Sequence, residues 1–450
     1  MGNKSAWDEI ALGEVIKIKH GWPFKSEFFS EELSGKPIVV NIGNFRYEGG
    51  VRFDSTTIRE YRAEYPREYE LTPGDILLVM TCQTAGGEIL GIPGRIPDDG
   101  RIYLHNQRLG KVVVTAPERA NAKYLYWLFL SPEFNRELYL SASGTKILHT
   151  SPNRIADFRF RLPPLAEQRA IAQILGTLDD KIELNRRMNE TLEAMARAIF
   201  KSWFVDFDPV RAKLALSKGE GAEGHQPFGM DAETAALFPE SFQESAVGKI
   251  PKGWMVKTLG DLVDSIGERV DATPAKDGER YIALDDMPSH SIDLSTWRVG
   301  SEVNSSIVRF RKGDILFGAM RPYFHKVGLA QFAGITRTTT FVLRPKKEAL
   351  RHFALLHFSS DDVVDYATTA SVGTTIPYVR WDALGRCEIA LPPDSALASF
   401  ERAATPATEL IGLNGEQSRA LAAIRDALLP KLISGEIRVR DAESYQEAGT

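Results

Sequence analysis

Residues 162–169 read Leu-Pro-Pro-Leu-Ala-Glu-Gln-Arg, and the helix that they open decides the fold of this chain. The two prolines end whatever precedes them, because proline lacks an amide donor and restricts the residue before it. No proline follows until Pro209, and apolar residues recur at spacings of three and four from Ile171 to Ile199. This period predicts one long helix from the proline pair to about Phe204.

The same helix start occurs a second time, 229 positions later in the chain. Leu162-Pro163-Pro164 corresponds to Leu391-Pro392-Pro393, and the match runs without a gap from Gly144, which matches Gly373, to Phe200. So long a shared register predicts an internal repeat. Two helices of equal length, each following a globular segment, suggest an antiparallel pair. The alternative is that each helix covers its own domain and that the two never meet.

The repeat extends into the globular segments. Trp7 is echoed by Trp254, and the run Gly-Asp-Ile-Leu occurs at 74–77 and again at 313–316. We therefore expect an α+β fold in which two mixed α/β domains are separated by a long antiparallel two-helix coiled coil. The predicted segments are a first globular domain (1–161), a first spacer helix (162–210), an irregular connector (211–247), a second globular domain (248–391), a second spacer helix (392–437) and a polar tail (438–450).

Composition limits the function classes. The chain has 450 residues, a net charge of −5 and two cysteines, Cys82 and Cys387, neither of which has a metal-ligand neighbour. A disulfide scaffold or a metal site is therefore not expected. The N-terminal residues lack the apolar run of a secretory signal, and no stretch approaches the roughly 18 apolar residues of a membrane span. We expect a cytoplasmic protein with no membrane association.

One window of the chain is strongly basic although the whole chain is acidic. Residues 306–347 contain nine lysines and arginines and one acid, Asp314. Such a window indicates either a solvated strand face or a surface that meets phosphates, because electrostatic fields act locally.

The sequence offers no catalytic constellation that we could identify. It contains no Gly-x-x-x-x-Gly-Lys-Ser/Thr loop, and its histidines are scattered without metal-ligand spacing. The Pro-Pro pairs follow Leu162 and Leu391, where an amino-methyltransferase would need Asn or Asp, so they indicate helix starts. We expect no catalytic residues, although an enzyme of a kind without a recognised motif remains an alternative.

The order of these motifs, in duplicate, points to a known family. The motifs are the helix start at 162–171, Gly-Lys-Ile-Pro-Lys-Gly-Trp at 248–254, the two Gly-Asp-Ile-Leu runs and Ser-Gly-Thr-Lys-Ile at 143–147. Together they resemble the specificity subunits of type I restriction–modification enzymes over nearly the whole chain. The second helix start departs from that pattern, with Asp394-Ser395-Ala396-Leu397 in place of the usual Leu-x-x-Gln.

The resemblance implies a non-catalytic DNA reader. Each target-recognition domain would read one half of a bipartite target in double-stranded DNA, and the helix pair would fix the gap between the halves. Two methyltransferase subunits, which carry S-adenosylmethionine, would dock on this chain, and motor-nuclease subunits would join for cleavage. No cofactor is expected on this chain itself. The alternatives are a self-contained DNA methyltransferase or nuclease, and a coiled-coil assembly protein with no DNA role.

The candidate DNA-facing residues lie where the two copies diverge, after each Gly-Asp-Ile-Leu strand, and just after the Ser-Gly-Thr turn. Arginine and glutamine can make bidentate bonds to base edges, whereas lysine mostly meets phosphate. The predicted residues are Thr81, Gln83, Thr84, Lys146 and His149 in the first domain, and Arg321, Tyr323, His325, Lys326 and Arg337 in the second.

Aromatic residues gather at the end of the first long helix, namely Phe200, Trp203, Phe204 and Phe207. They predict either packing on the second helix, at Leu428, Leu429 and Leu432, or an apolar patch that binds a methyltransferase subunit. The sequence does not choose between these two readings.

Overall fold

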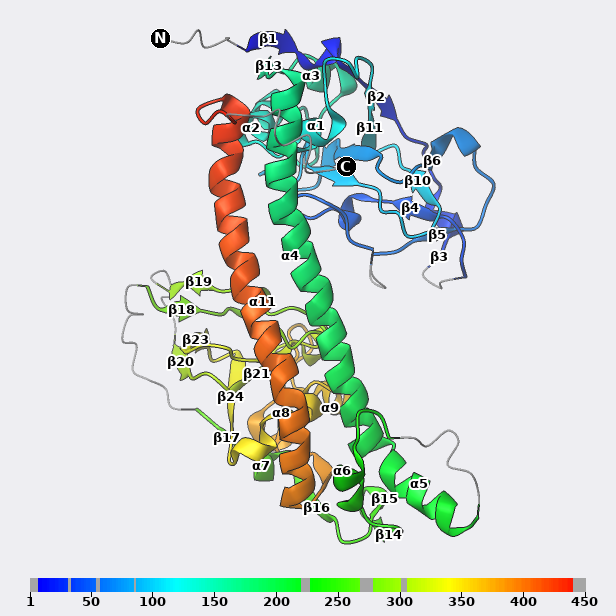
Figure 1. The fold of residues 1–450 in the computed structure, drawn as a ribbon, viewed down its shortest axis with the longest axis vertical. Coiled ribbons are helices and arrows are strands. Elements are labelled where there is room, and N and C mark those ends of the chain that lie inside the picture. The colour runs from blue at the N-terminus through cyan, green and yellow to red at the C-terminus, as the bar shows by residue number, and fades with distance from the viewer. Residues whose placement is uncertain are drawn as a thin grey trace. The chain divides into compact units, whose positions relative to one another are not determined.

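The computed structural model describes residues 7–30, 34–53, 57–84, 86–219, 227–267, 278–300 and 306–439. The chain divides into two compact units, of which unit 1 comprises Met1–Asp180 and Ala422–Thr450, and unit 2 comprises Lys181–Leu421. Each unit is a mixed α/β body that contains part of both long helices, α4 (Leu165–Phe200) and α11 (Asp394–Ser434) (Figure 1).

The described part of unit 1 contains short strands and three α-helices besides the long ones. The helices are α1 (Ala122–Phe129), α2 (Pro132–Ser141) and α3 (Pro152–Ala156). The described strands form four sheets. Two of them have two strands each: β1 (Asp8–Ala11) with β13 (Arg159–Leu162), and β12 (Leu148–His149) with β8 (Thr81–Cys82). The five-stranded sheet has the order β3 (Phe29–Ser30), β5 (Glu60–Tyr61), β4 (Ile38–Val40), β10 (Tyr103–His105) and β6 (Glu70–Leu71), and the four-stranded sheet has the order β2 (Ile16–His20), β11 (Leu109–Val114), β7 (Ile76–Val79) and β9 (Pro93–Arg95).

Unit 2 has a similar plan. Its shorter helices are α5 (Asp208–Ser217), α6 (Ala232–Ala236), α7 (Leu259–Leu262), α8 (Arg351–Phe358), α9 (Asp361–Thr369) and α10 (Trp381–Leu384). Its described strands also form four sheets. Two of them have two strands each: β14 (Phe242–Ser245) with β15 (Gly248–Pro251), and β16 (Met255–Thr258) with β25 (Glu388–Leu391). The other two have four strands each, in the orders β17 (Val263–Ser265), β24 (Thr340–Pro345), β21 (Ile315–Gly318), β22 (Val327–Leu329) and β19 (Arg298–Val299), β18 (Arg280–Tyr281), β23 (Gly334–Arg337), β20 (Ile307–Phe310).

The predicted internal repeat is confirmed by the topology. The sheet order β2-β11-β7-β9 in unit 1 matches β17-β24-β21-β22 in unit 2, and the pair β1–β13 matches β16–β25. The Gly-Asp-Ile-Leu runs enter the equivalent strands β7 and β21. Gly74 and Gly313 both have a φ of +88°, which glycine adopts without steric cost.

The aspartate of each Gly-Asp-Ile-Leu run closes the turn in the same way. Asp75 accepts the backbone N–H of Thr72 at 2.8 Å, and Asp314 accepts that of Arg311 at 2.8 Å. Asp314 is buried and Asp75 is half-buried, and carboxylates that are withdrawn from water are usually paired with a cation. Lys111 on β11 supplies it in unit 1, and Arg344 on the matching strand β24 supplies it in unit 2.

Within unit 1 the two long helices pack against each other. Ile171 and Leu175 are fully buried in one apolar cluster with Leu429 and Leu432. Burying each such side chain contributes roughly 1.5–3 kcal/mol. The pairing is antiparallel, because Glu167 bonds to Arg438 at 2.7 Å whereas Asp179, later in α4, bonds to Arg425, earlier in α11, at 2.6 Å.

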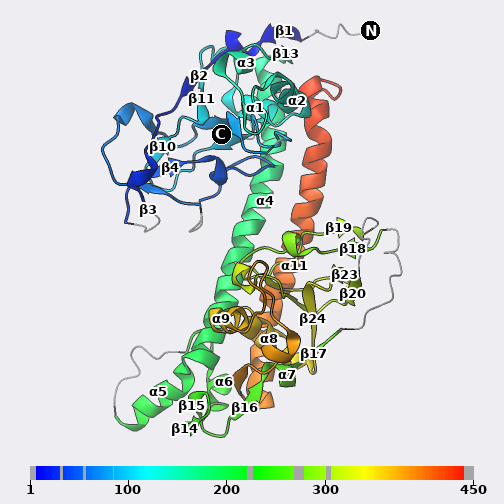
Figure 2. The same cartoon turned by 180° about the vertical axis from the view of Figure 1, so that it is seen from behind.

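Within unit 2 the same two helices lie side by side (Figures 1 and 2), and polar side chains form the seam between them. Asn185 donates to Gln417 at 2.9 Å, and Asn189 accepts from Asn414 at 2.9 Å and donates to the carbonyl of Ile411 at 3.2 Å. The antiparallel pairing predicted from the repeat is therefore present in each unit, and the alternative of two helices that never meet is wrong.

Two glycines within α11 have a packing role. A side chain on Gly412 would come within 2.8 Å of Gln331, and one on Gly415 would come within 2.4 Å of Ser295. Both positions must therefore stay small for α11 to approach the second globular domain. The helix also continues without a break through Pro406 and Pro430.

The segment predicted as an irregular connector, 211–247, contains regular structure. Most of α5, all of α6 and strand β14 lie within it, whereas residues 220–226 lie outside the described residues. Local signals start these helices: Pro209 stands in the first turn of α5, and Asp231 caps α6 by accepting the N–H of Thr234 at 2.7 Å. Of the predicted polar tail, residues 440–450 lie outside the described residues.

Candidate nucleic-acid interface

In unit 1 the structure brings together two segments that the sequence places 68 residues apart. Strand β8 pairs with β12 so that Thr81 stands opposite His149, and the Thr81 hydroxyl is 3.1 Å from His149 Nδ1. Thr81 is nearly buried, whereas His149 is exposed. The hydrogen bond occupies Nδ1, so Nε2 is the ring atom that remains for a ligand.

A tight turn presents the residues before His149. Ser143 and His149 exchange two backbone hydrogen bonds, of 2.9 and 2.8 Å. Gly144 has a φ of +107°, and a Cβ there would come within 1.9 Å of the Ile147 carbonyl oxygen. Only glycine fits this position, and the resulting turn leaves Lys146 exposed.

The remaining two candidates of the first domain differ in whether the side chain is bonded within its own loop. Gln83 and Thr84 are both exposed. The Thr84 hydroxyl donates to the Glu88 carboxylate, and this bond lowers the pKa of Glu88. Gln83 therefore has the side chain better suited to reach a base edge, because Thr84 already has a partner within the loop.

Unit 2 repeats the strand-and-turn arrangement with other side chains. Met320 and Val372 both bridge to Tyr378, as Thr81 and Ser143 do to His149. Gly373 has a φ of +94° and takes the place of Gly144. Tyr378 is 45% exposed and is the counterpart of His149, so it is a candidate that we did not predict. The shift of 229 positions between the repeats would have found it.

The loop after β21 has an unusual backbone. Arg321 has a φ of +49°, and its N–H donates to the carbonyl of Pro377 at 2.7 Å. Its guanidinium lies 6.0 Å from the ring centroid of Phe324. Tyr323 and Phe324 are both exposed. The loop thus offers two surface aromatic rings and one arginine, which are suited to stacking and to acidic groups.

Two predicted DNA-facing residues of this loop have internal partners instead. His325 is only 5% exposed, and its Nε2 donates to the carbonyl of Ser359 at 2.8 Å, while burial lowers its pKa. Lys326 is half-buried and donates to the carbonyl of Leu284 at 2.8 Å. Both side chains therefore bond within the domain, and the structure does not support the predicted DNA contact of either residue.

A cavity of about 620 Å³ lies beside this loop and the Val372–Tyr378 turn. Its walls are partly apolar and partly polar. The lining residues are Ala319, Met320, Thr338, Thr339, Phe341, Ile376, Tyr378, Val379, Arg380, Trp381 and Asp382. Met320, which precedes the divergent loop of the second domain, and the exposed Tyr378 both line this cavity.

The basic window 306–347 is partly neutralised within the protein. Arg309 bonds to Glu279 at 3.1 Å, and Arg344 bonds to Asp314 at 2.8 Å. The window therefore contributes less free positive charge than its composition suggests. The remaining candidate, Arg337, is exposed at the end of β23.

The aromatic residues at the end of α4 belong to the core of unit 2. Phe200, Trp203 and Phe204 are at most 4% exposed. Phe204 packs edge-on against Phe353 and Phe400 with ring centroids 5.0 Å apart. The rings pack on the second helix, as one of the two predictions had it, but they do so at Phe400 near its start and not at Leu428, Leu429 and Leu432. The burial of these three residues does not support the other prediction, an exposed apolar patch for a methyltransferase subunit. Phe207 is half-buried against Trp254, at 5.6 Å.

Among the described residues, no helix combines the length and apolar character that crossing a bilayer requires.

Comparison with known proteins adds to this geometry. The family described as "Type I restriction modification DNA specificity domain" matches residues 4–194 and 251–396. The HindI specificity subunit of Haemophilus influenzae is 26% identical and aligns over 96% of this chain and 100% of its own length. The MjaIX specificity subunit of Methanocaldococcus jannaschii is 27% identical over 71% of this chain and 70% of its own. A solved S subunit from M. genitalium has a TM-score of 0.55 and 15% identity, and the similarity covers 96% of this chain and 98% of that one.

Proposed function

The chain belongs to the type I restriction modification DNA specificity family, and on that premise we propose that each of its globular domains reads one half of a bipartite DNA target. As a specificity subunit, it is the DNA-recognition component and not the catalytic component of such an enzyme.

One observation carries the proposal: the two domains share a backbone arrangement and differ in the side chains that it presents. The strand-and-turn site holds Thr81 and His149 in unit 1, and Met320 and Tyr378 in unit 2. A shared scaffold with different side chains is what two readers of different sequences require, since base edges are read by side chains. We assign Gln83, Lys146 and His149 to the first half-site.

For the second half-site we assign Arg321, Tyr323 and Tyr378, with Arg337 as a phosphate contact. Tyrosine rings can stack on bases, and arginine can bond two acceptors of a guanine. Thr81 acts through His149, whose ring it holds, rather than by touching DNA.

The long helices are proposed to set the gap between the half-sites. Helix α4 has 36 residues and α11 has 41, so at about 1.5 Å per residue they measure roughly 54 and 62 Å. Two readers on one face of a duplex need a separation near one helical turn, about 34 Å, or a multiple of it. Helices of this length are sufficient for that task.

Exposed apolar residues at matching positions support two equivalent docking sites for methyltransferase subunits. The repeat matches Leu184 on α4 to Leu413 on α11, and both are at least half exposed. It also matches Met195 to Ile424, and both of these are exposed. Large apolar side chains exposed on a helix are typical of contact surfaces. Because the positions are related by the repeat, one kind of partner can use both.

The partner subunits would supply the chemistry. We propose two methyltransferase subunits that hold S-adenosylmethionine, and motor-nuclease subunits that join them for cleavage. We propose that the assembly acts on DNA in the cytoplasm.

Methylome sequencing tests the proposed function. A host that carries this chain with its partner subunits should contain a bipartite methylated motif, and a host that lacks this chain should not. A methylated motif that persists without this chain would contradict the proposal, as would methylation by the isolated chain supplied with S-adenosylmethionine.

The docking sites have a separate test. Native mass spectrometry should find two methyltransferase subunits on the unaltered chain, one on Leu184→Glu or Leu413→Glu, and none on the double variant. Leu216→Glu, an equally exposed leucine on α5, is the matched control and should keep both partners. Two bound partners on the double variant would rule out these sites.

A further inference from the structure

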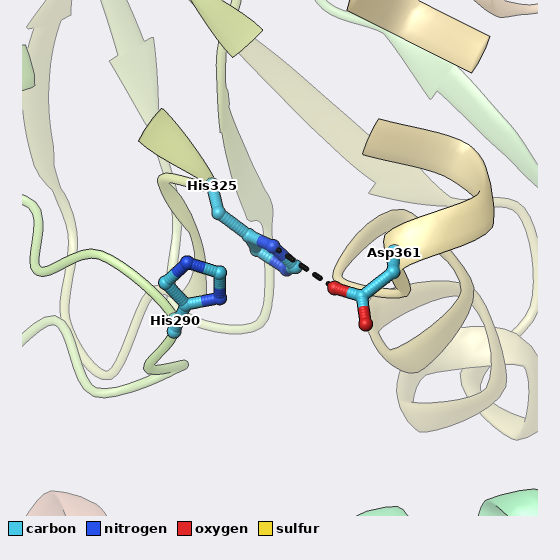
Figure 3. Close-up of side chains that lie close together, drawn as sticks. All are labelled: His290, His325 and Asp361. Atoms are coloured by element: carbon cyan, nitrogen blue, oxygen red, sulfur yellow. Dashed lines mark ion pairs between the residues drawn. The ribbon is translucent and has the colours of Figure 1, made fainter. Parts of the chain in front are cut away.

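Three side chains that can bind metals meet in unit 2, away from the strand-and-turn site. They are His290, His325 and Asp361, and their ligand atoms all lie within 4.8 Å of one another (Figure 3). His290 lies after the short helix η6 (Leu284–Asp286), His325 directly follows η8 (Pro322–Phe324), and Asp361 is the first residue of α9. Three separate segments thus converge on one point.

The hydrogen bond of His325 leaves its other nitrogen ready for a ligand. The carbonyl of Ser359 can only accept, so Nε2 carries the proton of the neutral ring. Nδ1 then has a free lone pair, and it lies 3.5 Å from the Asp361 carboxylate on the side of the cluster (Figure 3). A backbone carbonyl that fixes the ring in this way is the usual support of a metal-binding histidine.

Helix α4 holds the surrounding segments in place. Arg197 donates to the same Ser359 carbonyl at 2.9 Å, and its charge is balanced by Glu193 at 2.8 Å. Glu193 also accepts the hydroxyl of Ser291 at 2.9 Å, next to His290. Side chains of α4 therefore support the cluster, and Glu193 balances part of the positive charge of Arg197.

The two histidines are held together by their backbones as well. The N–H of His290 donates to the carbonyl of His325 at 3.0 Å, and the ring centroids are 4.2 Å apart. Both residues have a positive φ, of +57° and +53°. Side chains other than glycine rarely adopt this conformation, and it is retained where the surroundings require it.

We propose that His290, His325 and Asp361 form a binding site for a transition-metal ion of the Zn²⁺ class. Two imidazoles and one carboxylate suit Zn²⁺, whereas Mg²⁺ and Ca²⁺ prefer oxygen ligands alone. Tetrahedral zinc holds its ligand atoms about 3.3 Å apart, given bonds of about 2.0 Å. His290 and Asp361 are exposed and can close that difference by side-chain rotation, while His325 stays fixed. Water would complete the coordination.

Such an ion would join the loop that carries Arg321 and Tyr323 to α9 and to the segment that contains His290. Its bond to His325 would restrict the C-terminal end of this loop, whereas Arg321 lies at its N-terminal end. The site is therefore a means of stiffening one reading loop of the second domain, and it has no counterpart among the residues of unit 1 that the structure describes.

Calorimetric titration of the full, chelator-treated chain with Zn²⁺ tests this site. We expect one equivalent to bind, and Co²⁺ to give the visible absorption of a four-coordinate ion. His290→Ala and Asp361→Asn change exposed side chains, and each should weaken binding about tenfold or more. His20→Ala, an exposed histidine of unit 1, is the matched control and should bind as the unaltered chain does.

Hydrogen exchange gives a second readout. Zn²⁺ should slow exchange in residues 321–326 of the unaltered chain and should not do so in the two ligand variants. Absence of stoichiometric binding, binding that survives in either ligand variant, or equally tight binding of Mg²⁺ would overturn the proposal. None of these outcomes depends on whether DNA is bound.

Discussion

Thr81 and His149 occupy paired positions in unit 1, and Met320 and Tyr378 occupy the matching positions in unit 2. The polar pair of unit 1 fixes an imidazole by a hydrogen bond. The pair in unit 2 offers a phenol beside an apolar thioether, which suits stacking as well as hydrogen bonding. A change at one of these positions should therefore affect one half of the target only.

His149→Ala and Tyr378→Ala test this expectation in the assembled complex. Each should weaken binding of the cognate DNA by about 1–3 kcal/mol, because one base-edge or stacking contact is lost. The loss for His149→Ala should vanish when the first half-site is mutated, and that for Tyr378→Ala when the second is mutated. Binding assays on DNA with one altered half-site measure this. A uniform loss on all DNA would indicate phosphate contacts instead.

The sequence alone located part of this site. Thr81 and His149 could be predicted separately, because one follows a repeated strand and the other a repeated turn, but their contact depends on a two-residue strand pairing that has no sequence signature. The internal partners of His325 and Lys326 could not be predicted, because composition does not reveal burial. Their loop has positive φ angles at Arg321 and His325, which residues other than glycine seldom adopt.

His105 should make unit 1 sensitive to acid. Burial lowers its pKa from 6.5 to about 4, and Nε2 donates to the Leu109 carbonyl. Between those values the unfolded chain binds more protons than the folded chain, so stability is lost as the pH falls through this window. His105→Gln keeps a donor and removes the titration. The drop in unfolding free energy from pH 7 to pH 5 should be about 2 kcal/mol smaller in this variant.

Urea denaturation at the two pH values measures that difference. His149→Gln, which changes an exposed histidine on β12 that does not act on His105, should leave the drop unchanged. Equal drops in the unaltered chain and in His105→Gln would show that this histidine does not stay neutral when buried.

At the scale of elements, the asparagines between α4 and α11 distinguish this helix pair from a purely apolar one. A buried polar contact costs stability relative to leucine packing but restricts the register in which two helices can pair. Asn185 and Asn414 are also matched by the internal repeat, since they are 229 residues apart. The seam therefore lies where repeat-related positions of α4 and α11 face each other.

Asn414→Ala should destabilise unit 2 by about 1–3 kcal/mol, because the Asn189 side-chain oxygen loses its donor in a buried seam. Leu413→Ala changes the adjacent, exposed residue and should cost less than about 0.5 kcal/mol. Urea denaturation of both variants measures the contrast. Similar costs for the two would mean that water replaces the lost bond.

The long helices were predictable because their apolar period persists over more than thirty residues, and periodicity outweighs single prolines and glycines. The short elements were not. Helix α6 has five residues and many strands have two to four, too few for a period to be visible. The packing role of the α11 glycines could not be predicted for a different reason: their close contacts with Gln331 and Ser295 come from distant parts of the chain.

At the scale of the whole molecule, the proposed spacer predicts that helix length sets the gap in the target. Seven residues added between Asp180 and Lys181, together with seven between Leu421 and Ala422, lengthen both helices by about 10.5 Å, or two turns. The bipartite motif should gain about three base pairs in its gap and keep both half-site sequences. Methylome sequencing of a host carrying the variant measures the gap.

Seven residues inserted after Gly100, on an exposed turn of unit 1, are the control and should leave the gap unchanged. An unaltered gap in the double insertion variant would exclude the helices as the element that fixes spacing.

Unit 1 contains both the first described residues of the chain and the last, because Trp7, Glu167 and Arg438 are joined in one network. During synthesis, residues 181–421 leave the ribosome before the segment that completes the apolar core of unit 1. The domain that is translated first is thus the last to be finished, and premature termination in α11 would expose its core to proteases and chaperones. Only full-length chains would then accumulate in the cell.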